Sequence, residues 1–203
     1  MFAYIKGSLG VKTNGYIVID VNGIGYKIFM SETAINKLGA IGEIIKIHTY
    51  VRVREDDISI YGFNTNEELR MFELLLSVSG IGAKSALVIL SNVSVSSFAL
   101  AIINNDINLL KKLPGIGPKT AQRVILELKD KLKKENEIVA NENTDISDTI
   151  NTAIMDDEKI AEATAALKVL GYTGKEIEKA LEKVDANLSV EDIIRKGLLN
   201  LAR

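Results

Sequence analysis

A nine-residue motif occurs twice in this chain and decides the fold of its central part. Residues 78–86 read VSGIGAKSA, and residues 113–121 read LPGIGPKTA, 35 positions further along. A segment with apolar residues at helical spacing precedes each copy, and another follows it. Each Gly-Ile-Gly therefore predicts a tight turn between two helices, and the chain holds two such units in tandem.

The spacing of the motif excludes two other glycine-rich loops that bind phosphate. A Walker loop has glycine directly before Lys-Ser or Lys-Thr, and Ala83 and Pro118 stand there instead. A dinucleotide-binding fingerprint has a third glycine where this chain has Ser85 and Thr120. The motif therefore predicts neither a nucleotide-hydrolysing loop nor a dinucleotide site.

The residue types of the motif suit the phosphate backbone of DNA. Two glycines let the chain approach a bulky anion and adopt positive φ, while the middle isoleucine anchors the turn in the core. The next helix begins with exposed N–H donors, and a lysine two residues past the second glycine adds an ionic contact. The alternative is a tight helix–helix turn and nothing more, but the matched lysines of the two copies argue against it. The predicted DNA-binding residues are Gly80, Ile81, Gly82, Lys84, Ser85, Gly115, Ile116, Gly117, Lys119, Thr120 and Arg123.

Charge is distributed unevenly along the chain. The net charge of −2 and the pI near 5.6 argue mildly against a nucleic-acid partner. Residues 63–134, however, carry ten basic and six acidic side chains, and residues 135–155 carry five acidic and no basic ones. The positive charge is thus concentrated in the segment that holds both motifs.

Residues 1–63 predict a small β-barrel. Ser31 is expected to begin a short helix that Gly39 ends, with Ile35 and Leu38 facing inward. Segments rich in β-branched and aromatic residues predict five strands, at 3–9, 16–21, 26–30, 42–54 and 59–63. Five strands with one interposed helix indicate a Greek-key barrel of the OB type, a fold that often binds nucleic acid.

The remainder of the chain is predicted to be helical. From Asn66 the spacing changes, and Leu69, Phe72 and Leu76 lie on one helical face. Residues 135–155 have few apolar anchors and predict a flexible linker. Three short helices follow at 159–170, 173–184 and 189–202, with Thr173 and Ser189 beginning the last two. The expected fold class is multidomain α+β, with an OB-type barrel (1–63), an all-α tandem domain (64–134), the linker (135–155) and a three-helix bundle (156–203).

Composition excludes several function classes. With no cysteine, the chain has no thiolate nucleophile, disulfide or cysteine–zinc site. A Ser-His-Asp triad would need His48, which alternates with apolar neighbours in a predicted strand and is interpreted as structural. The apolar runs are too short for a membrane span and the first residues lack the features of a secretory signal, so we expect a cytoplasmic protein with no membrane partner.

The paired Gly-Ile-Gly elements resemble helix-hairpin-helix motifs, which bind DNA backbones without sequence preference. They follow a barrel that contains Val53-Arg54-Glu55-Asp56 and then Tyr61-Gly62-Phe63, and they precede a tethered helical domain. This order is similar to that of the RuvA family of bacterial Holliday junction proteins. The resemblance covers the chain apart from the linker, and the combination of elements is more specific than either hairpin alone.

The resemblance implies a homotetramer on whose open fourfold face a four-way DNA junction lies flat. The hairpins would hold the arms, and an acidic pin at the centre, matched here by Glu55 and Asp56 with Asp57 added, would help to separate strands. The protein would have no catalytic residue, cofactor or metal of its own. Its last domain would recruit the ATP-driven motor RuvB, which would supply the energy, and the resolvase RuvC is a further candidate partner. The candidate motor contacts are Leu167, Leu170, Tyr172 and Ile177, which are also the expected core of a small bundle.

Other interpretations remain open at this point. The three adjacent acids can be a solvated turn, whereas a nuclease metal site is disfavoured because neighbouring carboxylates do not easily converge on one ion. A base-excision glycosylase also uses a Leu-Pro-Gly-Ile-Gly hairpin, but needs a catalytic Asp downstream, where only Asp130 stands within fifteen residues of Gly115. A single-strand-binding barrel would stack bases on aromatic side chains, which make up 5% of this chain and include no Trp.

Overall fold

The computed structural model describes residues 2–141, 153–185 and 188–202. Contacts divide the chain into two compact units. The first contains Met1–Leu76 and Ile81–Asn92, and the second contains Ser77–Gly80 and Val93–Arg203. One of the places where the chain passes from one unit to the other lies inside the first copy of the motif, directly after Gly80.

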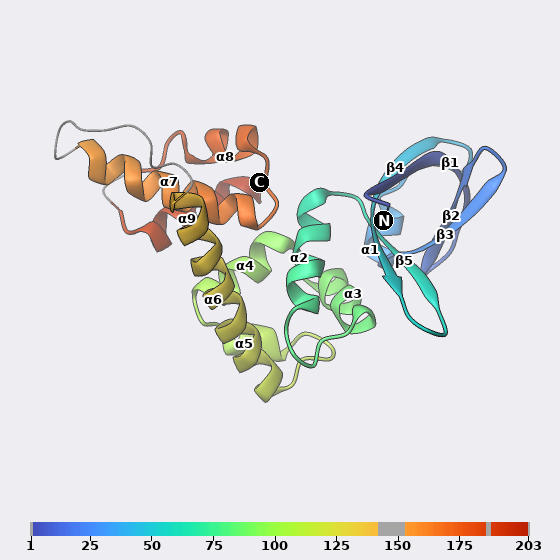
Figure 1. Cartoon of the computed structure of the whole chain (residues 1–203), viewed down its shortest axis with the longest axis horizontal. Helices are drawn as coiled ribbons and strands as arrows, with labels where there is room; N and C mark the ends of the chain where they lie inside the picture. Colours follow the sequence, from blue (N-terminus) through green and yellow to red (C-terminus); the bar gives the residue numbers. More distant parts are fainter. Residues whose placement is uncertain (1, 142–152, 186–187, 203) are drawn as a thin grey trace. The chain divides into compact units, whose positions relative to one another are not determined.

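The first unit is built on a closed five-stranded barrel (Figure 1). Its strands are β1 (Tyr4–Lys12), β2 (Tyr16–Val21), β3 (Ile24–Phe29), β4 (Ile44–Val53) and β5 (Ile58–Phe63). They follow the order β1-β2-β3-β5-β4, and all neighbours are antiparallel except β3 and β5. The predicted OB-type barrel and its five strands are confirmed.

Alternating side chains fill the barrel. Leu9, Ile17, Ile19, Ile28 and Ile47 are buried together in one core, because every second residue of a strand faces the same side. The short helix α1 (Glu32–Asn36) lies between β3 and β4, and the Ser31 hydroxyl accepts its Ala34 N–H at 3.1 Å. The predicted cap is confirmed, while the helix ends at Lys37, two residues before Gly39.

Two further helices belong to the first unit, α2 (Asn66–Leu76) and α3 (Ala83–Asn92). The ring of Phe72 lies 4.8 Å from that of Phe63 and 5.4 Å from that of Tyr61, which joins α2 to the barrel. Of the three residues on the predicted apolar face of α2, Phe72 is buried, whereas Leu69 and Leu76 are only half-buried. The aromatic cluster instead buries the stripe of Met71, Phe72, Leu74 and Leu75.

The second unit is helical. It contains α4 (Val95–Ile103), α5 (Ile107–Lys111), α6 (Pro118–Asn141), α7 (Ala153–Val169), α8 (Gly174–Leu181) and α9 (Val190–Leu201). The hydroxyl of Ser94 caps α4, and the carboxylate of Asp106 caps α5. Pro118 is the first residue of α6, where its missing N–H has no helical partner to lose.

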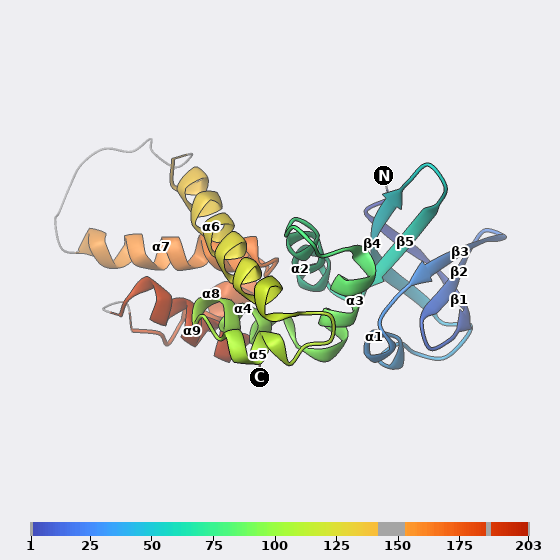
Figure 2. The same cartoon turned by 90° about the horizontal axis from the view of Figure 1, so that it is seen from below.

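Helix α6 is longer than predicted (Figure 2). It continues to Asn141, so residues 135–141 of the expected linker are helical, and no glycine or proline follows Pro118 within it to end it earlier. Helix α7 begins at Ala153 and includes the last three residues of that segment. Residues 142–152 lie outside the described part of the chain, and a flexible linker there stays a prediction.

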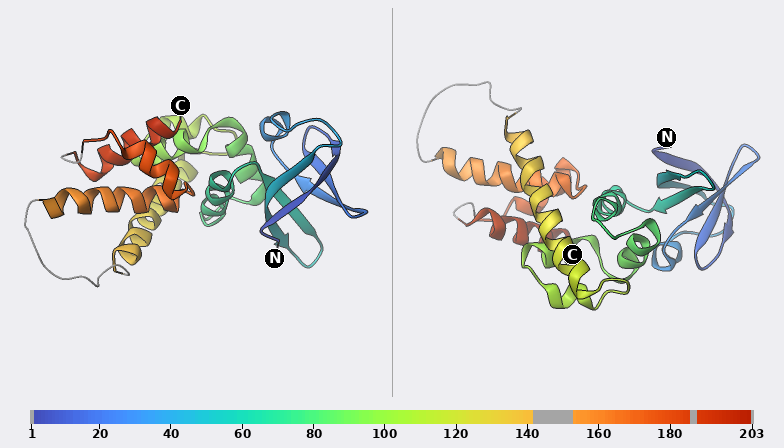
Figure 3. Two further views of the ribbon diagram at one scale, coloured as in Figure 1. Left: turned by 90° about the horizontal axis from the view of Figure 1, so that it is seen from above. Right: turned by 60° about the horizontal axis from the view of Figure 1, so that its bottom comes forward.

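The last three helices form the predicted bundle (Figure 3, orange to red). The Glu176 carboxylate accepts from the N–H of Thr173 at 2.8 Å and from its hydroxyl at 2.6 Å, which fixes the start of α8. The Ser189 hydroxyl accepts the Asp192 N–H at 3.2 Å and begins α9. Both predicted helix starts are confirmed. Among the described residues no single helix is long and apolar enough to cross a membrane, and only α3 and α4 taken together meet those criteria.

Candidate nucleic-acid interface

The first glycine of each motif is required by its backbone conformation. Gly80 has φ of +92° and Gly115 has φ of +84°, a region that side chains with a Cβ rarely adopt. The isoleucines that follow, Ile81 and Ile116, are buried and anchor the turns as predicted. These two positions explain how the turns fold, and they leave open what the turns bind.

The backbone conformation does not require glycine at the second glycine position of either motif. Neither Gly82 nor Gly117 has a positive φ, so the expectation that both glycines of each copy adopt it is wrong. A Cβ built on Gly82 or on Gly117 would meet no atom of the protein within 4 Å. Both glycines are exposed and stand directly before a helix, α3 or α6. An absent side chain at an open position suits the close approach of a group from outside the chain.

Each open glycine is followed by an exposed lysine in the first turn of a helix. Lys84 is the second residue of α3, and Lys119 is the second residue of α6. Ser85 and Thr120 come next and are half-buried. The unpaired N–H groups of a first helical turn and an ammonium beside them together attract an anion.

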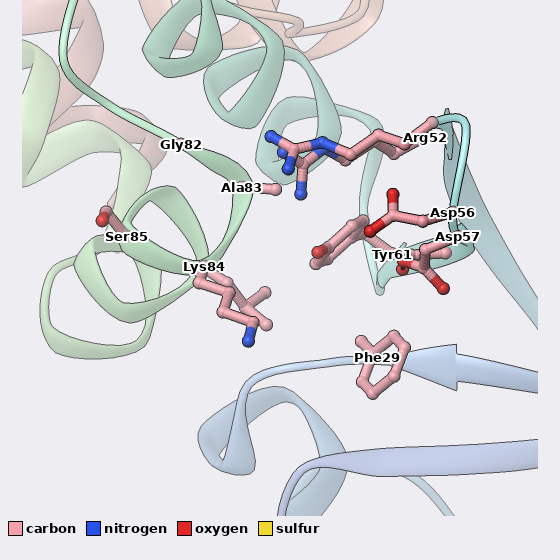
Figure 4. Close-up of a pocket in the computed structure, with 12 residues that line it drawn as sticks. Phe29, Arg52, Asp56, Asp57, Tyr61, Gly82, Ala83, Lys84 and Ser85 are labelled. Carbon is pink, nitrogen blue, oxygen red and sulfur yellow. Dashed lines mark hydrogen bonds between the residues drawn. The ribbon is translucent and has the colours of Figure 1, made fainter.

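In the first unit, Lys84 faces a groove of about 590 Å³ (Figure 4). Arg52 extends from the β4–β5 hairpin toward Ala83 at the start of α3, and Lys84 reaches the groove from the opposite wall. The groove is lined, among others, by the charged and aromatic residues Arg52, Arg54, Asp56, Asp57, Tyr61 and Lys84. It therefore combines a cationic part with an acidic rim that belongs to the loop between β4 and β5.

That acidic loop is exposed, as predicted, but its three acids are not equivalent. Asp57 closes the turn, because the Arg54 N–H donates to its carbonyl oxygen at 2.8 Å and the Ser59 hydroxyl donates to its carboxylate. Glu55 and Asp56 are exposed and have no hydrogen-bond or ion-pair partner within the described residues. In the described part of the chain, no group of three His, Cys, Asp or Glu side chains is arranged to hold a metal ion.

Three family models match this chain in order. The RuvA N-terminal domain matches residues 1–62, the SAM-like helix-hairpin-helix tandem matches residues 72–130, and the RuvA C-terminal domain matches residues 158–202. Among similar curated proteins, the Holliday junction branch migration complex subunit RuvA of Acetivibrio thermocellus is 48% identical over 204 residues. Proteins of the same name are 46% identical in Clostridium perfringens and 47% identical in Clostridium botulinum strain Loch Maree. All three alignments cover the whole of both chains.

The chain belongs to the RuvA family. The resemblance found in its sequence is thereby confirmed, together with the fold class of barrel, tandem hairpins and terminal helical domain. The names of the RuvA relatives do not favour the alternative of a base-excision glycosylase.

One residue predicted to bind DNA, Arg123, also has a contact inside the protein. The sequence predicts that Arg123, one turn beyond Lys119, reaches a neighbouring phosphate, and that role stays a prediction. Its guanidinium donates to the carbonyl oxygen of Ser79 at 3.1 Å and to the Ser79 hydroxyl at 3.3 Å. Ser79 is 44 residues earlier in the sequence, and helical spacing within α6 gives no signal for such a contact.

Burial argues against three of the four motor contacts that the family resemblance implies, while Tyr172 stays a prediction. Leu167, Leu170 and Ile177 are at most 1% exposed and form the bundle core, and Tyr172 is half-buried. Leu199 of α9, which is not among the residues predicted from the sequence, is 51% exposed and lines a groove together with Lys179, Glu182, Lys183 and Lys196. The sequence pattern could have indicated this exposure, because Leu199 lies outside the buried stripe of α9. That stripe consists of Ile193, Ile194, Gly197 and Leu198.

Proposed function

We propose that this protein binds four-way DNA junctions through their phosphate backbone and acts as the DNA-binding subunit of a branch migration complex. The observation that carries the proposal is the pair of open glycines, Gly82 and Gly117, each before a helix whose second residue is an exposed lysine. Nothing in the fold requires glycine at either position, whereas a phosphate that approaches the backbone does. The names of the relatives, which are branch migration subunits for Holliday junctions, support the same reading.

The contacts available at these sites read no base sequence. Backbone N–H groups and lysine ammonium groups bind phosphate oxygens, which are the same for every base. The family names and the tandem arrangement favour recognition of a branched structure over recognition of a sequence. We therefore assign Gly80, Ile81, Gly82, Lys84 and Ser85 to one backbone contact. The second consists of Gly115, Ile116, Gly117, Lys119 and Thr120.

The acidic loop gives the proposal its selectivity for a junction. Glu55 and Asp56 are exposed and have no charge partner among the described residues, and Asp56 lines the groove together with Arg52 and Arg54. Both carboxylates would repel a phosphate backbone that reached the loop tip. We propose that these two carboxylates are the pin that keeps strands apart at the junction centre. Asp57 supports the pin by closing its turn.

The other subunits of the complex are part of the same proposal. Because the chain has no Walker loop, we propose that the ATP-driven motor RuvB supplies the energy and docks on the last domain, and that RuvC is a further partner. We propose a homotetramer, for which the cross-strand pair Val53 and Ile58, each 70% exposed, offers an apolar surface to a second copy. Sedimentation of Val53→Glu against the natural chain tests that surface. The place of action is the cytoplasm, where chromosomal DNA is available.

Binding of the full chain to three labelled DNAs of equal length tests the function. A four-way junction should bind at least about tenfold more tightly than duplex or single strand, a difference of about 1.4 kcal/mol. Lys84→Ala and Lys119→Ala should weaken junction binding. Lys112→Ala, which removes an exposed lysine just before the second motif, is the matched control. Equal affinity for junction and duplex at moderate salt, or strong dependence on arm sequence, contradicts the proposal.

A further inference from the structure

The two copies of the motif differ at the residue before the first glycine. The second copy has Pro114, whose ring fixes φ and which has no N–H to satisfy. Its turn is also closed internally, since the Ile116 N–H donates to the Leu113 carbonyl oxygen at 3.1 Å. The first copy has Ser79, which keeps a free φ and an N–H that needs an acceptor. The first turn is therefore the less constrained of the two by its own sequence.

Helix α6 supplies the constraint that Ser79 lacks. The Arg123 guanidinium donates to the Ser79 carbonyl and hydroxyl oxygens at 3.1 and 3.3 Å. The Glu127 carboxylate accepts the Ser79 N–H at 3.3 Å. Arg123 and Glu127 also form an ion pair, with 3.8 Å between Nε and Oε1. All three polar groups of Ser79 thus have a partner on one face of α6, one helical turn apart.

Helix α6 contacts the turn of the first motif, but α3 has no equivalent residues to contact the turn of the second motif. Subtracting the 35-residue offset from Arg123 and Glu127 gives Val88 and Asn92, at the equivalent places in α3. Neither has a cationic or an acidic side chain, so α3 cannot hold the second turn in the same way. The same helix whose first turn carries Lys119 therefore contacts Ser79 through residues of its second and third turns.

We propose that Arg123 and Glu127 are positioning residues that clamp the Ser79-Gly80 turn to α6 and so align the first hairpin for DNA. This inference rests on the proposed function and assigns Arg123 a role other than that of a phosphate ligand. Gly80, held at φ of +92°, leads directly into Ile81, Gly82 and the start of α3. The clamp makes DNA binding at the first hairpin depend on a helix that begins at the second.

The side chains are partly exposed, so each contact is modest. Arg123 is 51% and Glu127 is 32% exposed at the side chain, and exposed ion pairs are weakened by solvent. Loss of the hydrogen bonds in Arg123→Gln should weaken junction binding about three- to tenfold. Lys129→Gln removes the same charge from the same helix without touching Ser79 and is the matched control.

Glu127→Ala separates positioning from simple electrostatics. Removing a solvated acid from a DNA-binding domain should tighten binding, because it removes repulsion of phosphates. If Glu127 clamps the turn, Glu127→Ala should instead weaken junction binding by about the same factor as Arg123→Gln. Tighter binding by Glu127→Ala overturns the proposal.

Double-mutant cycles then locate the effect. If Arg123 acts through the first hairpin, Arg123→Gln should cost little in a Lys84→Ala background and its full factor in a Lys119→Ala background. A direct phosphate ligand beside Lys119 should show the full cost in the Lys84→Ala background, and that result overturns the proposal. Retained thermal stability of each variant shows that the folded protein is being compared.

Amide hydrogen exchange on the full chain without DNA tests the clamp apart from the function. The amides of Ser79 and Gly80 should exchange faster in Arg123→Gln and in Glu127→Ala than in Lys129→Gln. Unchanged exchange in both variants rejects the clamp, even if junction binding is observed. Faster exchange in a protein that does not prefer junctions would retain the clamp and reject the proposed function.

Discussion

The guanidinium of Arg195 in α9 donates two hydrogen bonds to the side-chain oxygen of Asn104, at 3.1 Å from Nε and 2.8 Å from Nη2. Asn104 caps the C-terminus of α4, so this contact joins the last helix to the segment before the second hairpin. Arg195 also donates to the Asp192 carboxylate at 2.6 Å, which holds its side chain in place.

Asn104→Ala should loosen the attachment of the last three helices to α4. The substitution removes the shared acceptor and leaves the Arg195–Asp192 pair intact, so the docked population should fall about three- to tenfold. Backbone relaxation measured by NMR should show faster tumbling of residues 159–185 and 188–202. Asn108→Ala, at an exposed position of α5, should leave the tumbling of these residues unchanged, and equal tumbling in both variants contradicts the prediction.

The two glycines of one motif should respond differently to alanine. Gly80→Ala should lower the free energy of unfolding by about 1–2 kcal/mol, because φ of +92° is strained for a residue with a Cβ. Gly82→Ala should leave thermal stability nearly unchanged but weaken junction binding about tenfold, as one charge-assisted hydrogen bond to phosphate is lost. Denaturant unfolding and junction titration of both variants separate the two roles. Unchanged binding by Gly82→Ala would argue against a phosphate there.

Lys119→Ala should lower the salt dependence of junction binding. The slope of log affinity against log salt concentration should become shallower by about one, since one phosphate contact is lost. Affinity should fall by the same factor for junctions with different arm sequences. Lys112→Ala should keep the slope of the natural chain, and an unchanged slope in Lys119→Ala would show that Lys119 binds no phosphate.

Removing the charge of the acidic loop should reduce selectivity. Glu55→Gln combined with Asp56→Asn should strengthen duplex binding, because repulsion between the loop and the backbone disappears. The ratio of junction to duplex affinity should therefore fall. Asp57→Asn is the contrasting variant: it removes one charge of the loop and also weakens the hydrogen bond from Ser59, so it should strengthen duplex binding less than the double variant does. If the double variant has natural affinities for both DNAs at low salt, the loop is a solvated turn.

Stability of the last domain should depend on pH through Glu176. Its hydrogen bonds from Thr173 lower the pKa of Glu176 below the ordinary value of 4.5. A lowered folded-state pKa stabilises the fold above the ordinary pKa, and that contribution is lost as pH falls through the folded-state value. Thr173→Ala should cost about 1 kcal/mol at neutral pH. Thermal unfolding should show a smaller difference from the natural chain as pH is lowered below 4.5, and a constant difference would contradict this origin.

Local sequence signals predicted those parts of the structure that local interactions determine. Period-two strands, the Ser31 and Ser189 caps and the buried Ile81 and Ile116 anchors depend on neighbours within a few residues. Local signals do not distinguish two different surroundings that need the same residue pattern. An apolar helical stripe looks the same in the sequence whether it forms a core or a docking surface, so the pattern of Leu167, Leu170 and Ile177 predicts both, and only their burial distinguishes the two.

Contacts between residues far apart in the chain also could not be predicted from the sequence. The place of Arg123 one turn after Lys119 predicts a phosphate ligand, but nothing within α6 indicates its contact with Ser79, which is 44 residues earlier. The different demands on Gly80 and Gly82 also needed backbone angles and the surrounding space, since both are simply glycine in the sequence.

The position of Arg123 on an uninterrupted helix has a consequence for how the chain can change in length. An α-helix turns by about 100° and rises about 1.5 Å per residue, so one residue inserted between Lys119 and Arg123 would barely lengthen α6. It would, however, rotate Arg123 and Glu127 to another side of the helix, away from Ser79. What the spacing between Lys119 and Arg123 must preserve is thus the angle about the helix axis at which Arg123 and Glu127 point. Substitutions at exposed positions between them keep that angle, whereas single insertions or deletions change it, and the contact with Ser79 sets no such restriction beyond Glu127.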